Sequence, residues 1–171
     1  MTSEEKVLAT AEMHVRTGGY KGFSFRHIAR DTGLPSAGVH HHFPTKADLV
    51  ARLADEYTSR FLDAVDACPI EDRVECLRDL FAESLSQDGK MCLCGLLAAE
   101  SGGLPKNVAE AARAFLQQLA DRLQPAFADS DNSRCKALGV LSQLEGAAML
   151  ATAFADPGVF LSATRNLVRT D

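Results

Sequence analysis

The stretch SFRHIARDTGLPSAGVHHHFPTK, residues 24–46, predicts two short helices joined by a tight turn. Ser24 is a residue type that caps helix N-termini, and Gly33 favours the end of a helix because glycine tolerates a left-handed backbone. Pro35 fits the first turn of a helix but not its interior. We therefore expect the second helix to begin at Pro35 or Ser36 and to run to about His42, which is the layout of a helix-turn-helix.

The sequence on both sides of this stretch also predicts helices, because apolar residues recur at spacings of three and four and almost never alternate. One helix is expected over 3–18, ending at Gly18-Gly19, and a long one from about Lys46 to Ala67. Proline, glycine and aspartate residues then separate further predicted helices, the last of which is expected over 159–167. The pattern predicts an all-α fold of about nine helices, three of them before residue 47.

Charge is distributed unevenly along the 171 residues, whose net charge is −5. Residues 1–50 hold six lysines and arginines, five acidic residues and all five histidines, while residues 51–171 hold twelve basic and eighteen acidic residues. This contrast fits a nucleic-acid-binding module joined to an acidic body, although a short window can also vary by chance. No run approaches the roughly 20 apolar residues of a membrane span, and the N-terminus has no signal-peptide pattern, so we expect a cytoplasmic protein without a membrane partner.

The first fifty residues resemble the TetR family of transcriptional regulators. The resemblance lies in the pattern Val7-Leu8-x-x-Ala11, Gly19-Tyr20, Ser24 to Ala29, Gly33-Leu34 and Val39 to Leu49, with every gap matching. It implies a three-helix DNA-binding head, residues 1–47, and a six-helix body for ligand binding and dimerisation, residues 48–171. It further implies a homodimeric regulator, commonly a repressor, which binds a pseudo-palindromic operator in double-stranded DNA and is released by a small-molecule or thiol-reactive signal.

The resemblance also implies which residues contact DNA. The second helix of the motif would enter the major groove, and its small first residues would let the backbone approach closely. Gly38 and His40 differ from the residues that relatives usually carry, so we expect sparse direct base readout. Lys46 resembles the family's backbone-anchoring lysine. The predicted DNA-binding residues are Ser24, Arg26, His27, Ser36, Ala37, Gly38, His40, His41, Thr45 and Lys46.

Expectations for the body are less specific, because helical regulators build pockets and interfaces from ordinary apolar residues. Plain core packing is the alternative role for the apolar candidates. Five cysteines form an odd set, which favours reduced thiols, and Cys92 and Cys94 are candidate redox sensors. The candidate effector-pocket residues are Tyr57, Phe61, Phe81, Cys92, Leu96, Glu100 and Phe115. The candidate dimer-interface residues are Leu141, Leu144, Ala148, Phe160 and Leu167.

Enzymatic and metal-binding functions find little support in the sequence. Successive residues on a helix point 100° apart, so His40, His41 and His42 do not present a chelating face. The chain contains no nucleophile elbow, P-loop or dinucleotide fingerprint, and we expect no catalytic residue, no metal and no cofactor. The alternative to a DNA-binding regulator is a helical small-molecule-binding or protein-binding module that no longer binds DNA, a reading suggested by Gly38, His40 and the acidic total.

Overall fold

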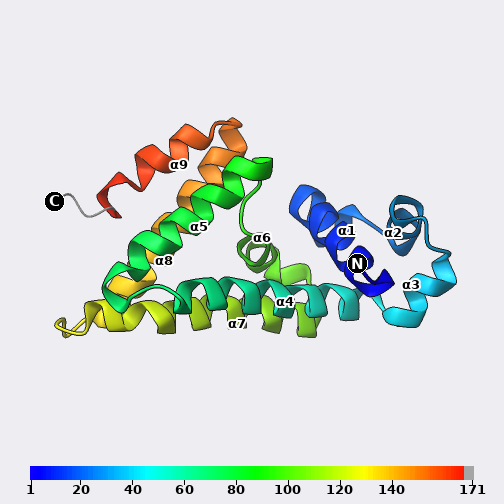
Figure 1. Cartoon of the computed structure of the whole chain (residues 1–171), viewed down its shortest axis with the longest axis horizontal. Helices are drawn as coiled ribbons and strands as arrows, with labels where there is room; N and C mark the ends of the chain where they lie inside the picture. The colour runs from blue at the N-terminus through cyan, green and yellow to red at the C-terminus, as the bar shows by residue number, and fades with distance from the viewer. Residues whose placement is uncertain (168–171) are drawn as a thin grey trace. The chain divides into compact units, whose positions relative to one another are not determined.

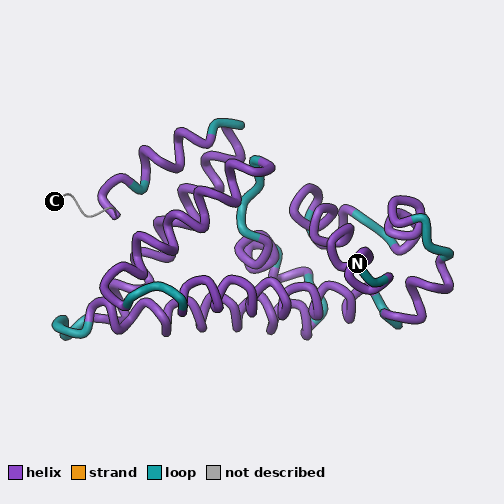
Figure 2. The backbone as a smooth tube through the Cα atoms, in the orientation of Figure 1, coloured by secondary structure: helices purple, strands orange, loops and turns teal. Residues whose placement is uncertain are grey.

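The computed structural model describes residues 1–167, and in that range the chain forms nine α-helices joined by turns, with no strand (Figures 1 and 2). The all-α prediction is confirmed. The α-helices are α1 (Ser3–Gly18), α2 (Phe25–Thr32), α3 (Ser36–His42), α4 (Lys46–Asp66), α5 (Arg73–Asp88), α6 (Leu93–Ala99), α7 (Lys106–Leu123), α8 (Ser133–Phe154) and α9 (Pro157–Ala163). Short 3-10 turns are η1 (Tyr20–Gly22), η2 (Ile70–Asp72), η3 (Ser101–Gly103), η4 (Gln124–Phe127) and η5 (Arg165–Leu167).

The helices belong to two compact units. The first unit contains Met1–Thr58 and Leu93–Phe115, and the second contains Ser59–Cys92 and the chain from Leu116 onward. Helices α4 and α7 each begin in the first unit and end in the second. The predicted DNA-binding head, residues 1–47, lies wholly within the first unit.

In the first unit, α1, α2 and α3 pack on one another around a small apolar core. Thr2 caps α1 through a capping box, in which its side chain accepts from the Glu5 N–H and the Glu5 carboxylate accepts from the Thr2 N–H. Two reciprocal bonds of this kind satisfy backbone donors that a helix N-terminus leaves open. The buried apolar residues of these helices, their flanking loops and the start of α4 include Val7, Leu8, Ala11, Val15, Phe23, Ile28, Ala29, Val39, Phe43, Leu49, Val50 and Leu53.

In the second unit, α8 packs against α5 and α9. The ring of Phe81 on α5 stacks at 6.4 Å on that of Phe160 on α9, and both side chains are buried. Cys68 and Cys76 form a disulfide that joins the end of α4 to α5. This pair corrects the expectation of reduced thiols throughout. Spacing alone did not reveal it, because α5 turns back beside the end of α4 only in the folded chain.

The last α-helix is shorter than the sequence pattern suggested. Apolar residues continue to Leu167, but α9 ends at Ala163 and the chain continues as the 3-10 turn η5. Among the described residues, α8 alone is long and apolar enough to cross a bilayer, a property that it shares with the core helices of many folded proteins, and 39% of its most apolar window is buried inside the chain.

Candidate nucleic-acid interface

The loops on either side of the helix-turn-helix anchor it to the core of the first unit. Phe23 precedes α2 and Phe43 follows α3, and both side chains are buried. Between the two helices Gly33 adopts a left-handed conformation with φ 72°, which residues with a Cβ adopt reluctantly. The turn therefore fixes the direction of α3 relative to α2.

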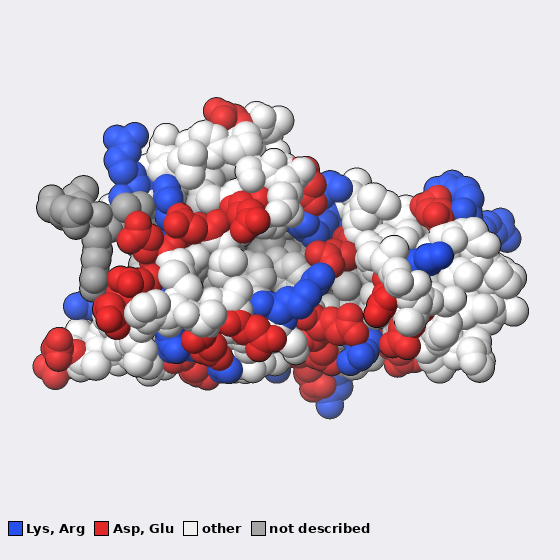
Figure 3. Space-filling view, viewed as in Figure 1, with Lys and Arg blue, Asp and Glu red and all other residues white. Residues whose placement is uncertain are grey.

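The solvent side of α2 and α3 carries most of the residues that the sequence predicts to bind DNA. The exposed ones on these helices are Arg26, Ser36, Ala37, His40 and His41, while His27 and Gly38 are half-buried. Residues 19–46 hold four lysines and arginines and one aspartate. Where these helices lie, Figure 3 shows blue side chains with few red ones. The structure thus brings small residues, histidines and a net positive charge to one exposed helical surface.

An aromatic contact connects α2 with α3. The rings of Phe25 and His40 meet edge to face with their centroids 4.7 Å apart. His41 makes a similar contact with His42 at 5.6 Å. Such contacts orient the imidazoles of α3 without using their nitrogen atoms, which stay available to hydrogen-bond.

Lys46 holds the start of α4 against the loop before α2. Its ammonium donates to the Phe23 carbonyl at 2.5 Å and lies over the rings of Phe23 and Tyr20, at 4.3 Å and 4.7 Å from their centroids. Partial burial lowers the pKa of Lys46, and the charge of Glu100 opposes that shift. Because an ammonium has three donors, two remain after the Phe23 contact. The sequence pattern missed this internal role.

Ser24 and Thr45, which directly precede α2 and α4, differ in the contacts of their hydroxyls. Thr45 shares a capping box with Asp48, in which the Thr45 hydroxyl accepts from the Asp48 N–H at 3.1 Å and donates to its carboxylate at 2.7 Å. Ser24 is the N-cap residue of α2, but its exposed side chain makes no capping hydrogen bond. The Ser24 hydroxyl is therefore better placed than that of Thr45 to meet a phosphate.

Glu100, predicted as an effector-pocket residue, also contacts the helix-turn-helix region. It follows α6, and its carboxylate accepts the main-chain N–H of Tyr20 at 2.9 Å. Gly19 permits this approach, because a Cβ there would lie 2.0 Å from a Glu100 oxygen, and the Gly19 φ is 68°. Helix α6 is therefore tied to the end of α1 through a carboxylate and a main-chain amide.

A polar cluster also joins α1 to α2. The Asp31 carboxylate lies 2.7 Å from Nε2 of His14 and accepts from Arg30 at 2.7 Å. The hydrogen bond from Arg30, with that of His14, lowers the pKa of Asp31 to about 2. The ring of His14 stacks on Phe23 at 5.8 Å. His14 thus packs as well as pairing with a carboxylate, which the sequence did not show.

The remaining pocket candidates form aromatic pairs within each unit. In the first unit the rings of Tyr57 and Phe115 are 5.7 Å apart, and in the second unit those of Phe61 and Phe81 are 5.6 Å apart. Leu96 is half-buried on α6. Their role in binding an effector stays a prediction.

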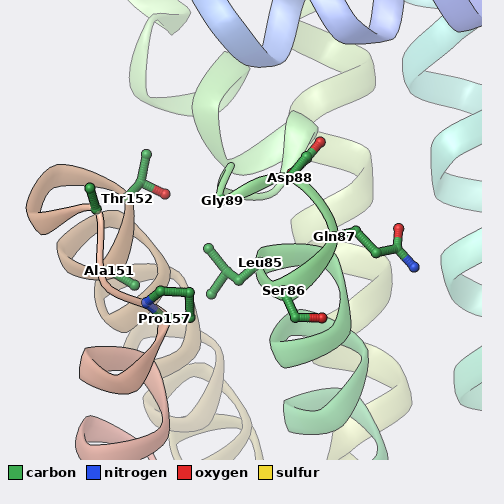
Figure 4. Close-up of a pocket in the computed structure, with 9 residues that line it drawn as sticks. Leu85, Ser86, Gln87, Asp88, Gly89, Ala151, Thr152 and Pro157 are labelled. Carbon is green, nitrogen blue, oxygen red and sulfur yellow. The ribbon is translucent and has the colours of Figure 1, made fainter.

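A separate pocket of about 400 Å³ opens between the end of α5 and the connection from α8 to α9. Figure 4 shows Leu85 pointing toward Ala151 and Pro157, while Gln87 points away from them. None of the predicted effector residues lines this pocket.

Both candidate sensor thiols, Cys92 and Cys94, are buried. Cys94 on α6 lies 4.0 Å from the Ala54 carbonyl. Cys92 lies beside the carboxyl of Glu145 on α8, whose two oxygens are also buried. Glu145 was not a predicted site residue, but the sequence holds a signal for it: it is the single charged residue between Lys136 and Asp156.

The residues predicted for the dimer interface are mostly buried within their own unit, and their role in dimerisation stays a prediction. Leu144, Ala148 and Phe160 have no exposed surface, and Leu141 is 5% exposed, because α5, α8 and α9 bury them inside their own unit. Leu167 is half-buried. The large apolar side chains that α8 and α9 expose are Leu138, Met149, Leu150, Phe154 and Leu161.

Comparison with known proteins agrees with this geometry. The model of the family described as "Bacterial regulatory proteins, tetR family" matches residues 7–53, which span α1 to the first part of α4. The HTH-type transcriptional regulator LmrA of Bacillus subtilis (strain 168) is 24% identical over 170 residues, which cover 95% of this chain and 87% of the relative.

Solved structures share the fold over nearly the whole chain. A TetR transcriptional regulator from Legionella pneumophila superposes with a TM-score of 0.91 at 24% identity, covering 98% of this chain and 96% of that one. A TetR-family regulator from Agrobacterium tumefaciens gives 0.88 at 26% identity, covering 96% and 94%. The similarity thus extends from the helix-turn-helix through the last described helix.

Proposed function

Because this chain is a transcriptional regulator of the TetR family, we propose that it is a ligand-responsive repressor that binds a pseudo-palindromic operator as a homodimer. The observation that carries the proposal is the exposed face of α2 and α3, with Arg26, Ser36, Ala37, His40 and His41 on a buried three-helix frame. A rigid frame holds such side chains at a fixed depth in the major groove.

The roles within this face follow from side-chain chemistry. Arg26, His40 and His41 carry donors suited to phosphate oxygens, which position a protein on DNA without reading its sequence. Ser36 and Ala37 are small enough to bring the backbone of α3 near base edges. Specificity then depends largely on DNA shape and on how closely the helix fits the groove.

Exposed apolar residues on α8 and α9 support the dimer. Leu138, Met149 and Phe154 are 45%, 53% and 66% exposed. An exposed apolar surface made of several large side chains is typical of a protein–protein interface. A two-fold dimer presents two recognition helices to two operator half-sites, as a palindrome requires.

We propose a small molecule, rather than a thiol reagent, as the releasing signal. Cys92 and Cys94 are buried, so a reagent would reach them only after the surrounding helices open. The chain would act in the cytoplasm, where bacterial operator DNA is found.

Selection of bound sequences from a random duplex pool tests this proposal. The full chain is expected to enrich one palindromic site, and its affinity for that site is expected to fall steeply as salt rises. Arg26→Ala should weaken binding and reduce the salt slope by about two, one phosphate contact for each subunit of a dimer. The matched control is Arg113→Ala, which removes an exposed charge from α7 and should leave both values unchanged.

Two results would contradict the proposal. Failure to enrich any site at low salt would favour a helical module that no longer binds DNA. Equal losses of DNA affinity in the Arg26 and Arg113 variants would show that the α2–α3 face is not the surface that contacts DNA.

A further inference from the structure

The carboxyl group of Glu145 has an unusual environment in the middle of α8. Both of its oxygens are buried and accept no hydrogen bond from the nitrogen and oxygen donors of the described residues. Its neighbours one turn away on the helix, Leu141 and Ala148, are buried and apolar. The Cys92 thiol lies beside the carboxyl, but a thiol is only a weak donor. The structure thus holds an acceptor group without a strong donor.

Such a group is costly to keep in an apolar interior. A buried carboxylate is stabilised when a cation or several strong donors meet it, and otherwise it resists ionisation. Burial raises the pKa of Glu145 to about 7, and the contact with Cys92 opposes that shift. Buried polar groups that the chain itself does not satisfy are characteristic of binding sites, where a ligand supplies the missing partner.

We propose that Glu145 is the polar anchor of the effector site and that the effector is an apolar molecule carrying a protonated amine. The inference rests on the proposed function, which requires an effector. An ammonium group donates a charge-assisted hydrogen bond and neutralises the carboxylate, whereas an alcohol offers only an ordinary hydrogen bond and an acid would be repelled. An apolar remainder suits the aliphatic surroundings on α8.

The position of this anchor along the chain suits a regulatory role. Cys92, which contacts Glu145, directly precedes α6, and Glu100, which accepts the Tyr20 N–H, directly follows it. The residue before α6 therefore contacts the buried carboxyl of Glu145. The residue after α6 accepts a hydrogen bond from the DNA-binding region. A ligand that draws Glu145 away from Cys92 changes the contacts of the residue directly before α6.

Calorimetric titration of the full chain with matched amines and alcohols tests the chemistry. The probes are 1-adamantylamine with 1-adamantanol, benzylamine with benzyl alcohol, and hexylamine with hexanol. The expected result is tighter binding of at least one amine than of its alcohol. Glu145→Gln, which keeps the side-chain shape, should weaken amine binding by at least about tenfold and leave the alcohol unchanged. Glu71→Gln, an exposed change in the same unit, should bind like the original protein.

The outcomes separate this inference from the proposed function, because titration needs no DNA. Equal binding of amine and alcohol, undiminished amine binding by the Glu145 variant, or no amine binding at millimolar concentration would overturn the amine site while leaving operator binding intact. If amine binding depends on Glu145 but the protein enriches no operator, the amine site is supported and the proposal of a repressor is contradicted.

Discussion

At the scale of single residues, Gly19 is the position where a small change should matter most. Its φ of 68° disfavours any side chain, and a Cβ would lie 2.0 Å from the Glu100 carboxylate. We expect Gly19→Ala to lower the free energy of unfolding by about 1–3 kcal/mol, because the backbone is strained and Glu100 must move. Urea denaturation measures this value.

The adjacent glycine provides the control. A Cβ at Gly18 would meet no atom within 4 Å, and alanine favours the helix in which Gly18 lies. Gly18→Ala should therefore leave the stability unchanged or raise it slightly. Similar midpoints for the two variants would mean that the contact between Gly19 and Glu100 does not constrain the fold.

Glu145 should give stability a distinctive dependence on pH. Its pKa in the folded chain is about 7, above the ordinary 4.5, so the folded state binds the proton more tightly than the unfolded state. The stability associated with this carboxyl is present below pH 4.5 and is lost as the pH rises toward 7. At pH 8, Glu145→Gln should be more stable than the original protein by on the order of 3 kcal/mol, and the difference should shrink as the pH falls.

Unfolding curves of both proteins between pH 4.5 and pH 8 measure this effect. Their difference cancels the titrations that the two proteins share. Glu71→Gln should follow the original protein at every pH, since Glu71 is exposed. A constant gap between Glu145→Gln and the original protein would rule out a titrating buried carboxyl.

At the scale of helices, the disulfide between Cys68 and Cys76 connects the end of α4 with α5. Closing a loop of this length restricts the unfolded chain, so its reduction should lower the stability by about 2–3 kcal/mol. Thiol titration of the unfolded protein should count three free thiols before reduction and five after it. Five thiols in a sample prepared without reductant would reject the pairing, and Cys135→Ser should leave the stability unchanged.

Helix boundaries were largely predictable from the sequence, because glycine and proline act locally. Gly33 and Gly89 end α2 and α5 with a positive φ, whereas α9 begins at Pro157, two residues before the expected start at residue 159. The contacts of Lys46 with Phe23 and of Glu100 with Tyr20 were not predictable. Each joins residues 23 or more positions apart, and no local pattern encodes where a long side chain ends in the folded chain.

At the scale of the whole molecule, a dimer interface is hard to assign from the sequence. Helix α8 has apolar residues both on the side that packs inside the unit, such as Leu144, and on the side that faces solvent, such as Met149. Apolar spacing therefore could not separate a core side from an interface side. The helix-turn-helix itself was easier to predict, because its residues follow one another within a single short motif.

The exposed apolar residues of α8 predict how to separate the proposed dimer. In the double variant Met149→Glu and Phe154→Glu, association would bury two charges in each subunit, so the dissociation constant should rise by at least about a hundredfold. Sedimentation velocity measures the change, and operator affinity should fall with it. The control Ile70→Glu alters an apolar residue of similar exposure, 47%, outside α8 and α9. A dimer that survives the double change would place the interface elsewhere.

The hydrogen bond between Tyr20 and Glu100 also bears on how such proteins diversify. Its donor is a main-chain N–H, which every residue except proline possesses. The side chain at position 20 can therefore vary during evolution while this link to α6 is kept, provided that glycine stays at position 19. A chimera that takes the helix-turn-helix region from a related protein should therefore keep this main-chain hydrogen bond to Glu100 without any further substitution.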